Sequence, residues 1–197
     1  MNMRLGAVAL LWLWPAMAAV NDIDPNKTAG NPSAPVTIQV FSDFECPACK
    51  ALHERTLPLL QRDFVSTGKV FLVYREFPLP QHAHSREAAS YATAAARLSL
   101  YQPVADALFR DQVAWSTNGK VWDTVAGVLT PSQQTRVKAA AGSASVLGEI
   151  LRDVNLGHAV PVTSTPMLLV SRGDKRYPVS GTLSYEILKS LIDDLSK

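Results

Sequence analysis

Two apolar runs, separated by a segment with helical spacing, open the patterned part of the chain. Val36–Ser42 reads as a strand, and residues 70–74 form a nearly continuous apolar run typical of a central strand covered on both faces. Between them, residues 50–63 have the pattern of a helix, which Pro58 should kink or split because proline removes an interior hydrogen bond. Strand, helix and strand at this spacing predict a right-handed βαβ unit.

From residue 85 to residue 157 the pattern is helical almost throughout, beginning with the alanine-rich stretch 87–98. Thr130-Pro131-Ser132-Gln133 is the signature of a helix start, in which threonine caps, proline takes the first helical position and glutamine reaches back. A last helix, with apolar residues at helical spacing from Val146, is expected to end at Gly157. We expect this block to be an insertion or small subdomain that covers one face of the core.

The pattern then returns to strands. Residues 167–170 and 176–180 are predicted to pair across a tight turn at Gly173-Asp174, and Pro178 places the second strand at a sheet edge. Apolar residues between 188 and 195 give a closing helix its buried face. The complete order is βαβ, helical block, ββα. It predicts an α/β fold in which a central sheet carries helices on both faces.

The N-terminus has the pattern of a secretory signal peptide. Arg4 precedes an apolar run, and Ala16-Met17-Ala18 follows it, which predicts removal of residues 1–18 with the cut before Ala19. The run is shorter than the roughly 20 apolar residues that span a membrane. An uncleaved membrane anchor is the alternative, because the tryptophans of the run suit a membrane interface. Residues 19–34 read as a leader segment of weak periodicity. We therefore expect a periplasmic or secreted protein, in a compartment where disulfides persist.

The amino-acid composition is that of a compact globular domain and gives little further indication of function. The formal net charge is +2 and falls to +1 without residues 1–18, because that segment holds Arg4 and no acidic residue. A balance so close to neutral gives no indication of nucleic acid as a partner. The remaining chain, about 180 residues, suits one domain or one domain carrying an insertion. Trp115 and Trp122 are expected to pack in the core.

The candidate chemistry lies in Cys46-Pro47-Ala48-Cys49, which holds both cysteines of the chain. The pair follows the first strand and begins a helix, so Cys46 is the predicted N-cap and Pro47 the first helical residue. There the Cys46 sulfur is near free backbone N–H groups at the positive end of the helix dipole, and both favour the thiolate. We interpret the pair as a redox centre in which Cys46 attacks and Cys49, one turn further on, resolves the mixed disulfide.

Other interpretations of the cysteines are weaker. A structural disulfide across so small a loop would stabilise the chain by only about 2 kcal/mol, and a domain of this length should fold without it. A full zinc site needs four ligands, and the sequence has no second pair at such spacing. A metal-trafficking module that uses both cysteines and one histidine, His53 or His84, is the alternative from another functional class.

Several motifs in order resemble the DsbA-like thiol:disulfide oxidoreductases. They are residues 30–38 and 41–49, Glu76-Phe77-Pro78-Leu79, Ser164-Thr165-Pro166-Met167 and Val179-Ser180-Gly181. The resemblance implies a thioredoxin fold with a first part at 35–80, a helical insertion at 81–160 and a second part at 161–197. It covers almost the whole mature chain.

The resemblance also implies site residues beyond the cysteines. Pro47 and Ala48 become the active-site dipeptide, while Pro166 is implied to be cis and to face the disulfide, and Thr165 to offer backbone hydrogen bonds to a bound substrate. No metal and no dissociable cofactor are expected, because the Cys46-Cys49 disulfide itself carries the two electrons.

The chain departs from the family pattern at one position. Thioredoxins and many DsbA-like proteins carry a buried acid six positions before the attacking cysteine, and Val40 stands there. Asp43 and Glu45 are closer in sequence. We expect them to be solvated loop charges near a helix N-terminus and assign neither a role in proton transfer.

The short segment before the predicted fold favours a disulfide donor over an isomerase. An isomerase would be expected to carry a dimerisation domain, and the roughly 16 residues between the predicted cut and Ala34 fall far short of the 50 or so that a domain needs. We therefore expect a monomeric disulfide donor, with a periplasmic reductase or isomerase as the alternative. The expected partners are unfolded or cysteine-containing exported proteins and, by family resemblance, a membrane redox protein that resets the disulfide.

Overall fold

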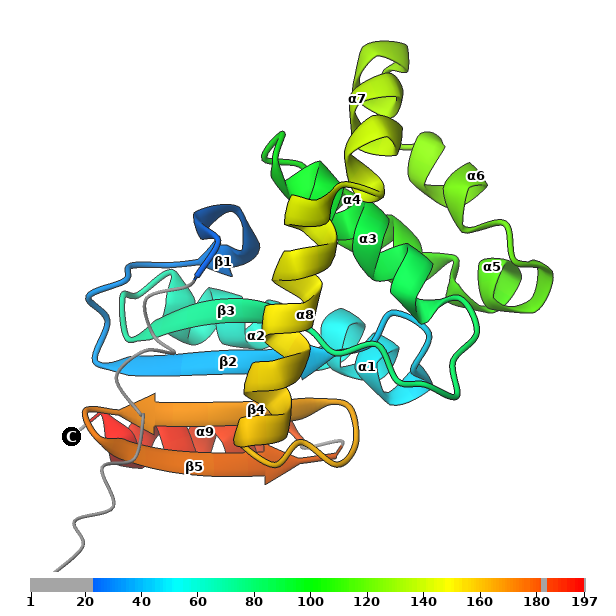
Figure 1. The fold of residues 1–197 in the computed structure, drawn as a ribbon. Helices are drawn as coiled ribbons and strands as arrows, with labels where there is room; N and C mark the ends of the chain where they lie inside the picture. The colour runs from blue at the N-terminus through cyan, green and yellow to red at the C-terminus, as the bar shows by residue number, and fades with distance from the viewer. Residues whose placement is uncertain (1–22, 182–183, 197) are drawn as a thin grey trace, which may run out of the picture.

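The computed structural model describes residues 23–181 and 184–196, so the predicted signal peptide, 1–18, lies outside the described residues. The described chain forms a five-stranded sheet in the order β1-β3-β2-β4-β5 (Figure 1). The strands are β1 (Thr28–Ala29), β2 (Val36–Ser42), β3 (Val70–Glu76), β4 (Met167–Arg172) and β5 (Lys175–Ser180). β2 and β3 run parallel, and the other neighbours pair antiparallel. The four predicted strands are confirmed, with β5 at an edge as Pro178 indicated.

The two faces of the sheet pack against different helices, because successive residues of a strand point to opposite sides. Phe41 belongs to the cluster beneath α8 (Ala144–Ala159). Its neighbour Val40 belongs to the opposite cluster, together with Ile192 of α9 (Tyr185–Leu195). Figure 1 shows α8 crossing in front of the sheet and α9 lying behind it, which confirms the predicted helices on both faces.

The helix after β2 consists of four short pieces. α1 (Pro47–Ala51) and α2 (Leu57–Leu60) are each followed by a π-helical turn, η2 (Leu52–Thr56) and η3 (Gln61–Val65). Pro58 lies in the first turn of α2 and has no N–H to donate to the preceding turn. The π turn before it shifts the hydrogen-bond pattern at this point. The predicted interruption at Pro58 is confirmed.

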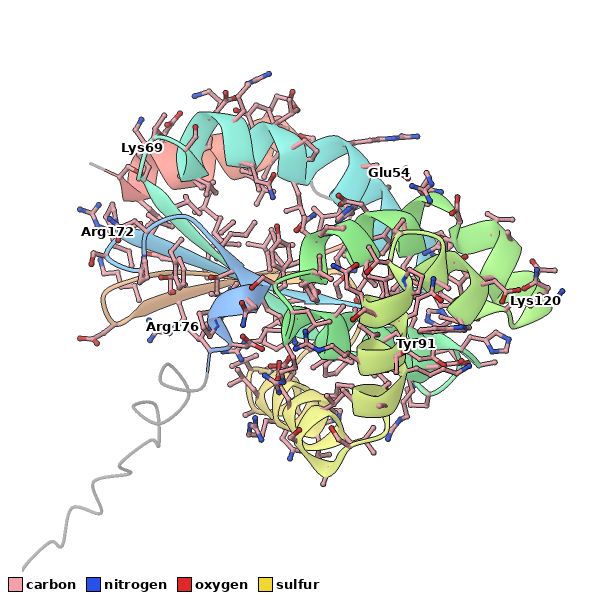
Figure 2. All side chains as sticks on the ribbon, turned by 90° about the horizontal axis from the view of Figure 1, so that it is seen from above. Glu54, Lys69, Tyr91, Lys120, Arg172 and Arg176 are labelled. Carbon is pink, nitrogen blue, oxygen red and sulfur yellow. The ribbon has the colours of Figure 1, made fainter. Side chains whose placement is uncertain are left out.

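The helical block lies beside the sheet. Its elements are α3 (Ser85–Ala96), α4 (Tyr101–Arg110), α5 (Gln112–Asn118), α6 (Val121–Ala126), α7 (Pro131–Ala141) and α8. Figure 2 shows Tyr91 and Lys120 of this block on one side of the molecule, while Arg172 and Arg176 of the β4–β5 hairpin lie at the opposite end of the sheet.

Two details of the block match the sequence predictions. Thr130 caps α7 and forms the reciprocal pair of hydrogen bonds with Gln133 that its motif predicts. Trp115 is fully buried, and its Nε1 donates to the Leu108 carbonyl oxygen at 2.7 Å. Trp122 is only half-buried, at the margin of the same core.

Gly157 does not end the last helix of the block, because α8 passes through it and continues to Ala159. The predicted helix end is therefore wrong. A Cβ at this position would lie 2.4 Å from Cε2 of Phe77 and 3.3 Å from Cδ1 of Phe41. The glycine is needed for the close approach of α8 to the sheet, and a glycine near a helix end resembles a stop signal in sequence.

A short N-terminal segment completes the sheet. η1 (Pro25–Lys27), a single 3₁₀ turn, leads into β1, which pairs with β3. Part of the predicted leader, residues 19–34, thus forms the edge of the sheet, which its weak periodicity did not indicate. Among the described helices, none combines the length and apolar character needed to cross a bilayer.

Lys27 of this segment is buried among carboxylates. Its Nζ lies 2.9 Å from Asp153 Oδ2, 3.3 Å from Glu149 Oε1 and 3.6 Å from Glu76 Oε1. Burial lowers the pKa of Lys27, but the three carboxylates together raise it above its ordinary value, so the side chain stays charged. The N-terminal turn is therefore joined to both β3 and α8.

Candidate active site

Both predicted cysteines lie where β2 leads into α1. Cys46 is the N-cap of α1 with an extended backbone, φ −80° and ψ 121°, and Pro47 is the first helical residue, as predicted. The thiols are free, and Cys46 is 7% and Cys49 1% exposed. Pro47 is exposed and Ala48 half-buried beside them. Cys46 is therefore the sulfur that a reaction partner can reach more readily.

The surroundings of Cys46 favour its thiolate. A hydrogen bond from the Cys49 thiol is the main cause that lowers the pKa of Cys46 to about 5. The Thr165 side chain and the backbone N–H groups of Cys49 and Ala48 act in the same direction, while burial opposes them. Cys46 forms no side-chain capping hydrogen bond. The helix start thus acts through the proximity of its N–H groups and not through a formed cap.

Cys49 has the opposite tendency. Burial raises its pKa well above the ordinary value of a thiol, and the Cys46 sulfur adds to the rise. The Cys49 sulfur accepts a hydrogen bond from the Asp43 backbone N–H at 3.4 Å. Cys49 therefore keeps its proton under conditions in which Cys46 has lost its own.

Thr165 and Pro166 lie beside Cys46, although 119 residues separate Thr165 from it in sequence. Their peptide bond is cis, as the family resemblance implied. They precede β4, whose pairing with β2 brings them to the end of the sheet where α1 begins. Cys46 Sγ lies 3.3 Å from the Thr165 carbonyl oxygen, to which the thiol donates while it is protonated. The fold thus brings the predicted site residues of both halves of the chain together.

The order of elements and the paired cysteines have a counterpart among known proteins. A family model described as thioredoxin matches residues 24–194. The chain belongs to the thioredoxin family. The match begins before β1 and ends within α9, so it includes the inserted helices as well as the sheet. The predicted thioredoxin fold with a helical insertion is confirmed.

Solved structures, a DsbA protein among them, share the fold of this thioredoxin-family chain. It is 25% identical to DsbA2 of Pseudomonas aeruginosa, with a TM-score of 0.67 over 86% of this chain and 93% of that one. It is 26% identical to a thioredoxin-like oxidoreductase of Silicibacter pomeroyi, with a TM-score of 0.72 over 89% of this chain and 94% of that one. The resemblance to DsbA-like proteins is confirmed.

A curated relative matches a shorter segment. The probable disulfide bond formation protein D of Bacillus cereus is 38% identical over 52 residues. These residues are 26% of this chain and 24% of the relative, so the match spans about a quarter of the relative's length. This sequence likeness is local, whereas the structural likeness to the solved proteins extends over most of the chain.

Asp43 and Glu45 are bound into the site, and the expectation of solvated loop charges is wrong. The Asp43 side chain is fully buried, accepts from the N–H groups of Glu45 at 2.8 Å and Leu79 at 2.7 Å, and lies 2.8 Å from His82 Nδ1. Glu45 is half-buried and accepts from the His84 N–H at 2.7 Å. Burial raises the pKa of Asp43 against the effect of these bonds. The bond to Glu45 is an Asx turn that local sequence could indicate; the other partners are set by the fold.

Val40 places an apolar side chain where the family commonly has a buried acid. It is 1% exposed and, with Cys49, Tyr74 and Tyr101, lines a small cavity of about 10 Å³. The Tyr101 hydroxyl donates to Glu76 Oε1 at 2.9 Å, and burial raises the pKa of Glu76 to about 7. A buried carboxyl is thus present on β3, the neighbour of the strand that carries Val40.

His53, one of the two histidines considered as metal ligands, has a ring that contacts other groups. His53 Nε2 lies 2.8 Å from Asp106 Oδ1, and its ring lies 4.5 Å from the Phe109 ring, centroid to centroid. Within residues 23–181 and 184–196, no three His, Cys, Asp or Glu side chains gather so as to hold a metal ion.

One buried amide at the site was missed by the sequence analysis. Gln112, the first residue of α5, is 3% exposed, and its Nε2 donates to the carbonyl oxygens of Phe44 at 2.6 Å and Cys46 at 3.0 Å. No local motif marks it, because its partners lie 68 and 66 residues earlier. Its role at the site can be recognised only once the helical block is packed against the turn that carries Cys46.

Proposed function

We propose that this chain is an exported thiol:disulfide oxidoreductase that donates its Cys46-Cys49 disulfide to other polypeptides. The observation that carries the proposal is the contrast between the two thiols, with the pKa of Cys46 lowered to about 5 and that of Cys49 raised. A thiol of low pKa is a good leaving group and is stable as the thiolate. A disulfide that contains such a sulfur is readily given away.

In the donor direction, a substrate thiolate attacks Cys46 Sγ of the oxidised pair. A bond forms between the substrate and Cys46, the bond between Cys46 and Cys49 breaks, and Cys49 leaves with the electron pair and takes up a proton. A second substrate thiolate then attacks the substrate sulfur of the mixed disulfide and releases the Cys46 thiolate. The substrate loses two electrons and the cysteine pair gains them, so no dissociable cofactor is required.

In the opposite direction, the Cys46 thiolate attacks a substrate disulfide and Cys49 resolves the product. Cys49 lies one helical turn from Cys46 and is almost inaccessible to other molecules, at 1% exposure. These properties suit a resolving thiol, whose attack is intramolecular. A periplasmic reductase or isomerase would use the same two residues and differ in its reduction potential.

Thr165 and Pro166 are proposed to form the place where the substrate backbone lies. The Thr165 carbonyl oxygen is 3.3 Å from Cys46 Sγ, so a substrate cysteine joined to that sulfur would lie next to the Thr165 backbone. An extended peptide can bind such a segment through main-chain hydrogen bonds. Exposed Pro47 and half-buried Ala48 border the same sulfur. Main-chain recognition would suit many client sequences.

Compartment and partners belong to the same proposal. The signal-peptide pattern of residues 1–18 supports export. The names of the relatives, DsbA2 and disulfide bond formation protein, support action on cysteine-containing proteins. The clients would be unfolded exported polypeptides, a membrane redox protein would reset the disulfide, and the chain would act as a monomer.

The reduction potential tests the direction of transfer. The protein lacking residues 1–18 is equilibrated in glutathione buffers, and its free thiols are counted after alkylation. We expect a potential near roughly −120 mV, the value of a strong disulfide donor, because the Cys46 thiolate stabilises the reduced form. A value near roughly −270 mV would assign the chain to the reductases, and failure to cycle would contradict the redox proposal altogether.

A Cys49→Ser variant tests the assignment of the two roles. Without the resolving thiol, the reaction of Cys46 with a disulfide-bonded client should stop at the mixed disulfide, which accumulates as a covalent adduct on a non-reducing gel. A Cys46→Ser variant is the control and should form little adduct, because Cys49 is buried and protonated. Equal adduct formation by both variants would contradict the assignment.

A further inference from the structure

The helical block touches the active-site turn along one seam. The rings of Phe44 and Phe109 lie 4.9 Å apart, centroid to centroid, and Lys50 Nζ donates to the Arg110 carbonyl oxygen at 2.9 Å. Gln112, two residues after Arg110, reaches the turn itself with its side-chain amide. The end of α4 and the start of α5 are thus held against the segment that carries Cys46.

Gln112 uses its side-chain nitrogen on two backbone carbonyls of that turn. An amide nitrogen has two hydrogens, one for each acceptor, and the distances are 2.6 Å to Phe44 O and 3.0 Å to Cys46 O. The peptide that follows Phe44 is also held at its other end, because the Glu45 N–H donates to Asp43. The Cys46 N–H donates to the Asp43 carbonyl oxygen. The turn is therefore held by Asp43, which belongs to it, and by Gln112, which comes from α5.

The Cys46 carbonyl is the first acceptor of α1. It accepts the N–H groups of Cys49 and Lys50, each at 3.1 Å, in addition to the Gln112 amide. These hydrogen bonds hold the peptide plane that follows Cys46, and with it the Cα atom from which the sulfur projects. The partial negative charge of a carbonyl oxygen disfavours a thiolate nearby, and a donor from a third side reduces that effect.

We propose that Gln112 is a positioning residue that keeps Cys46 in its thiolate-stabilising place at the helix start and so controls how readily the disulfide is donated. The inference rests on the proposed function, since it concerns the same cysteine pair. It also gives the inserted block a part in the chemistry: the block supplies, through one side chain, two hydrogen bonds that the βαβ unit does not provide for itself.

A Gln112→Met variant tests the proposal, because methionine keeps the length of the side chain and removes both donors. We expect the pKa of Cys46, measured from thiolate absorbance or iodoacetamide alkylation against pH, to rise by about half a unit or more. The equilibrium constant with glutathione should move about threefold towards the oxidised protein, because half a unit in pKa corresponds to that factor.

Gln134→Met is the matched control. The Gln134 amide also donates to two carbonyl oxygens, those of Ala126 at 3.0 Å and Leu129 at 3.1 Å, within the helical block. Both methionine variants should lose some resistance to urea, but only Gln112→Met should change the Cys46 pKa and the glutathione equilibrium. Equal values of both quantities in Gln112→Met and wild type would overturn the proposal.

A Gln112→Lys variant covers the case in which Gln112→Met does not fold. Lysine retains a donor of similar reach and adds positive charge, so the pKa of Cys46 should stay at the wild-type value or fall below it. A rise in Gln112→Lys would contradict the proposal. Failure of the wild-type pair to cycle with glutathione would instead contradict the proposed function, and the Cys46 titration would still report on the positioning role.

Discussion

Two thiols one helical turn apart hold their protons with very different strength in this protein. Cys46 is stabilised as a thiolate by the Cys49 thiol and by contacts at the helix start, whereas burial keeps Cys49 neutral. The two effects support each other, because the proton that Cys49 retains is the one it donates to Cys46. A small set of short-range contacts therefore separates a reactive sulfur from a protected one.

The stability of the reduced protein should depend on pH through Cys46. Its folded-state pKa of about 5 lies below the ordinary value of 9.0. The folded state therefore gains stability as the pH rises from about 5 towards 9, and loses it as the pH falls through 5. We expect the free energy of unfolding of the reduced wild type to grow relative to Cys46→Ser over this interval, measured by urea titration under reductant. A difference that stays constant with pH would contradict the low pKa.

Whether a site residue could be predicted depends on how far its partners lie from it along the sequence. Cys46, Pro47 and Cys49 could be predicted because a strand end, a helix start and the spacing of the pair are all local signals. Asp43 and Gln112 could not be assigned. Asp43 is bound by the loop after β3, and Gln112, from the inserted block, binds carbonyls 68 and 66 residues earlier in the chain. A buried aspartate and a solvated one have the same sequence signature until those partners are placed.

The elements are positioned by side-chain volume as much as by pattern. α8 lies on the sheet because residue 157 has no side chain, and the Phe77 ring occupies that space. The strands and the break at Pro58 were predictable from apolar runs and from the missing N–H. β1 could not be predicted, because two residues are too few to show the alternation of a strand. Its place depends on hydrogen bonds to β3 and on the burial of Lys27.

Two glycines of α8 provide a test of this packing. Gly157→Ala should destabilise the protein by about 1–3 kcal/mol, because the new Cβ would lie 2.4 Å from Phe77 and force a shift. Gly148→Ala, in the same helix, meets only the end of the Arg152 side chain at 3.7 Å and should stabilise by about 0.5–1 kcal/mol. Thermal or urea unfolding measures both. The same sign for the two variants would contradict this account.

Across the whole molecule, a buried cluster of charges joins segments far apart in sequence. Lys27 of η1 meets Glu76 of β3 and both Glu149 and Asp153 of α8. Arg75 Nη1 lies 2.9 Å from Asp153 Oδ1 in the same cluster. Removal of one member of such a cluster leaves an uncompensated buried charge, which is strongly destabilising. The cluster therefore fixes the N-terminal turn, the sheet and the inserted block relative to one another.

Glu76 should make the stability of the molecule depend on pH near neutrality. Burial raises its pKa from 4.5 to about 7, although Lys27 opposes the rise. The unfolded chain therefore ionises first, and the folded state loses stability as the pH rises from 4.5 to 7. We expect the stability of the wild type relative to Glu76→Gln to fall by up to about 3 kcal/mol over that interval and then to level off.

Urea titrations of both proteins at several pH values measure this trend. Glu186→Gln, at an exposed position of α9, controls for the loss of an acidic residue at the surface. A difference between wild type and Glu76→Gln that is flat from pH 4.5 to 7 would show that the folded-state pKa of Glu76 is not raised.

The buried Lys27 also constrains the order in which the molecule can be assembled. Lys27 stands near the beginning of the chain, and its partner Asp153 follows 126 residues later. During synthesis from the N-terminal end, Lys27 cannot be enclosed by its carboxylates until α8 has emerged and docked. The ion pairs that join Lys27 to α8 therefore form only when the sheet and the helical block are both in place.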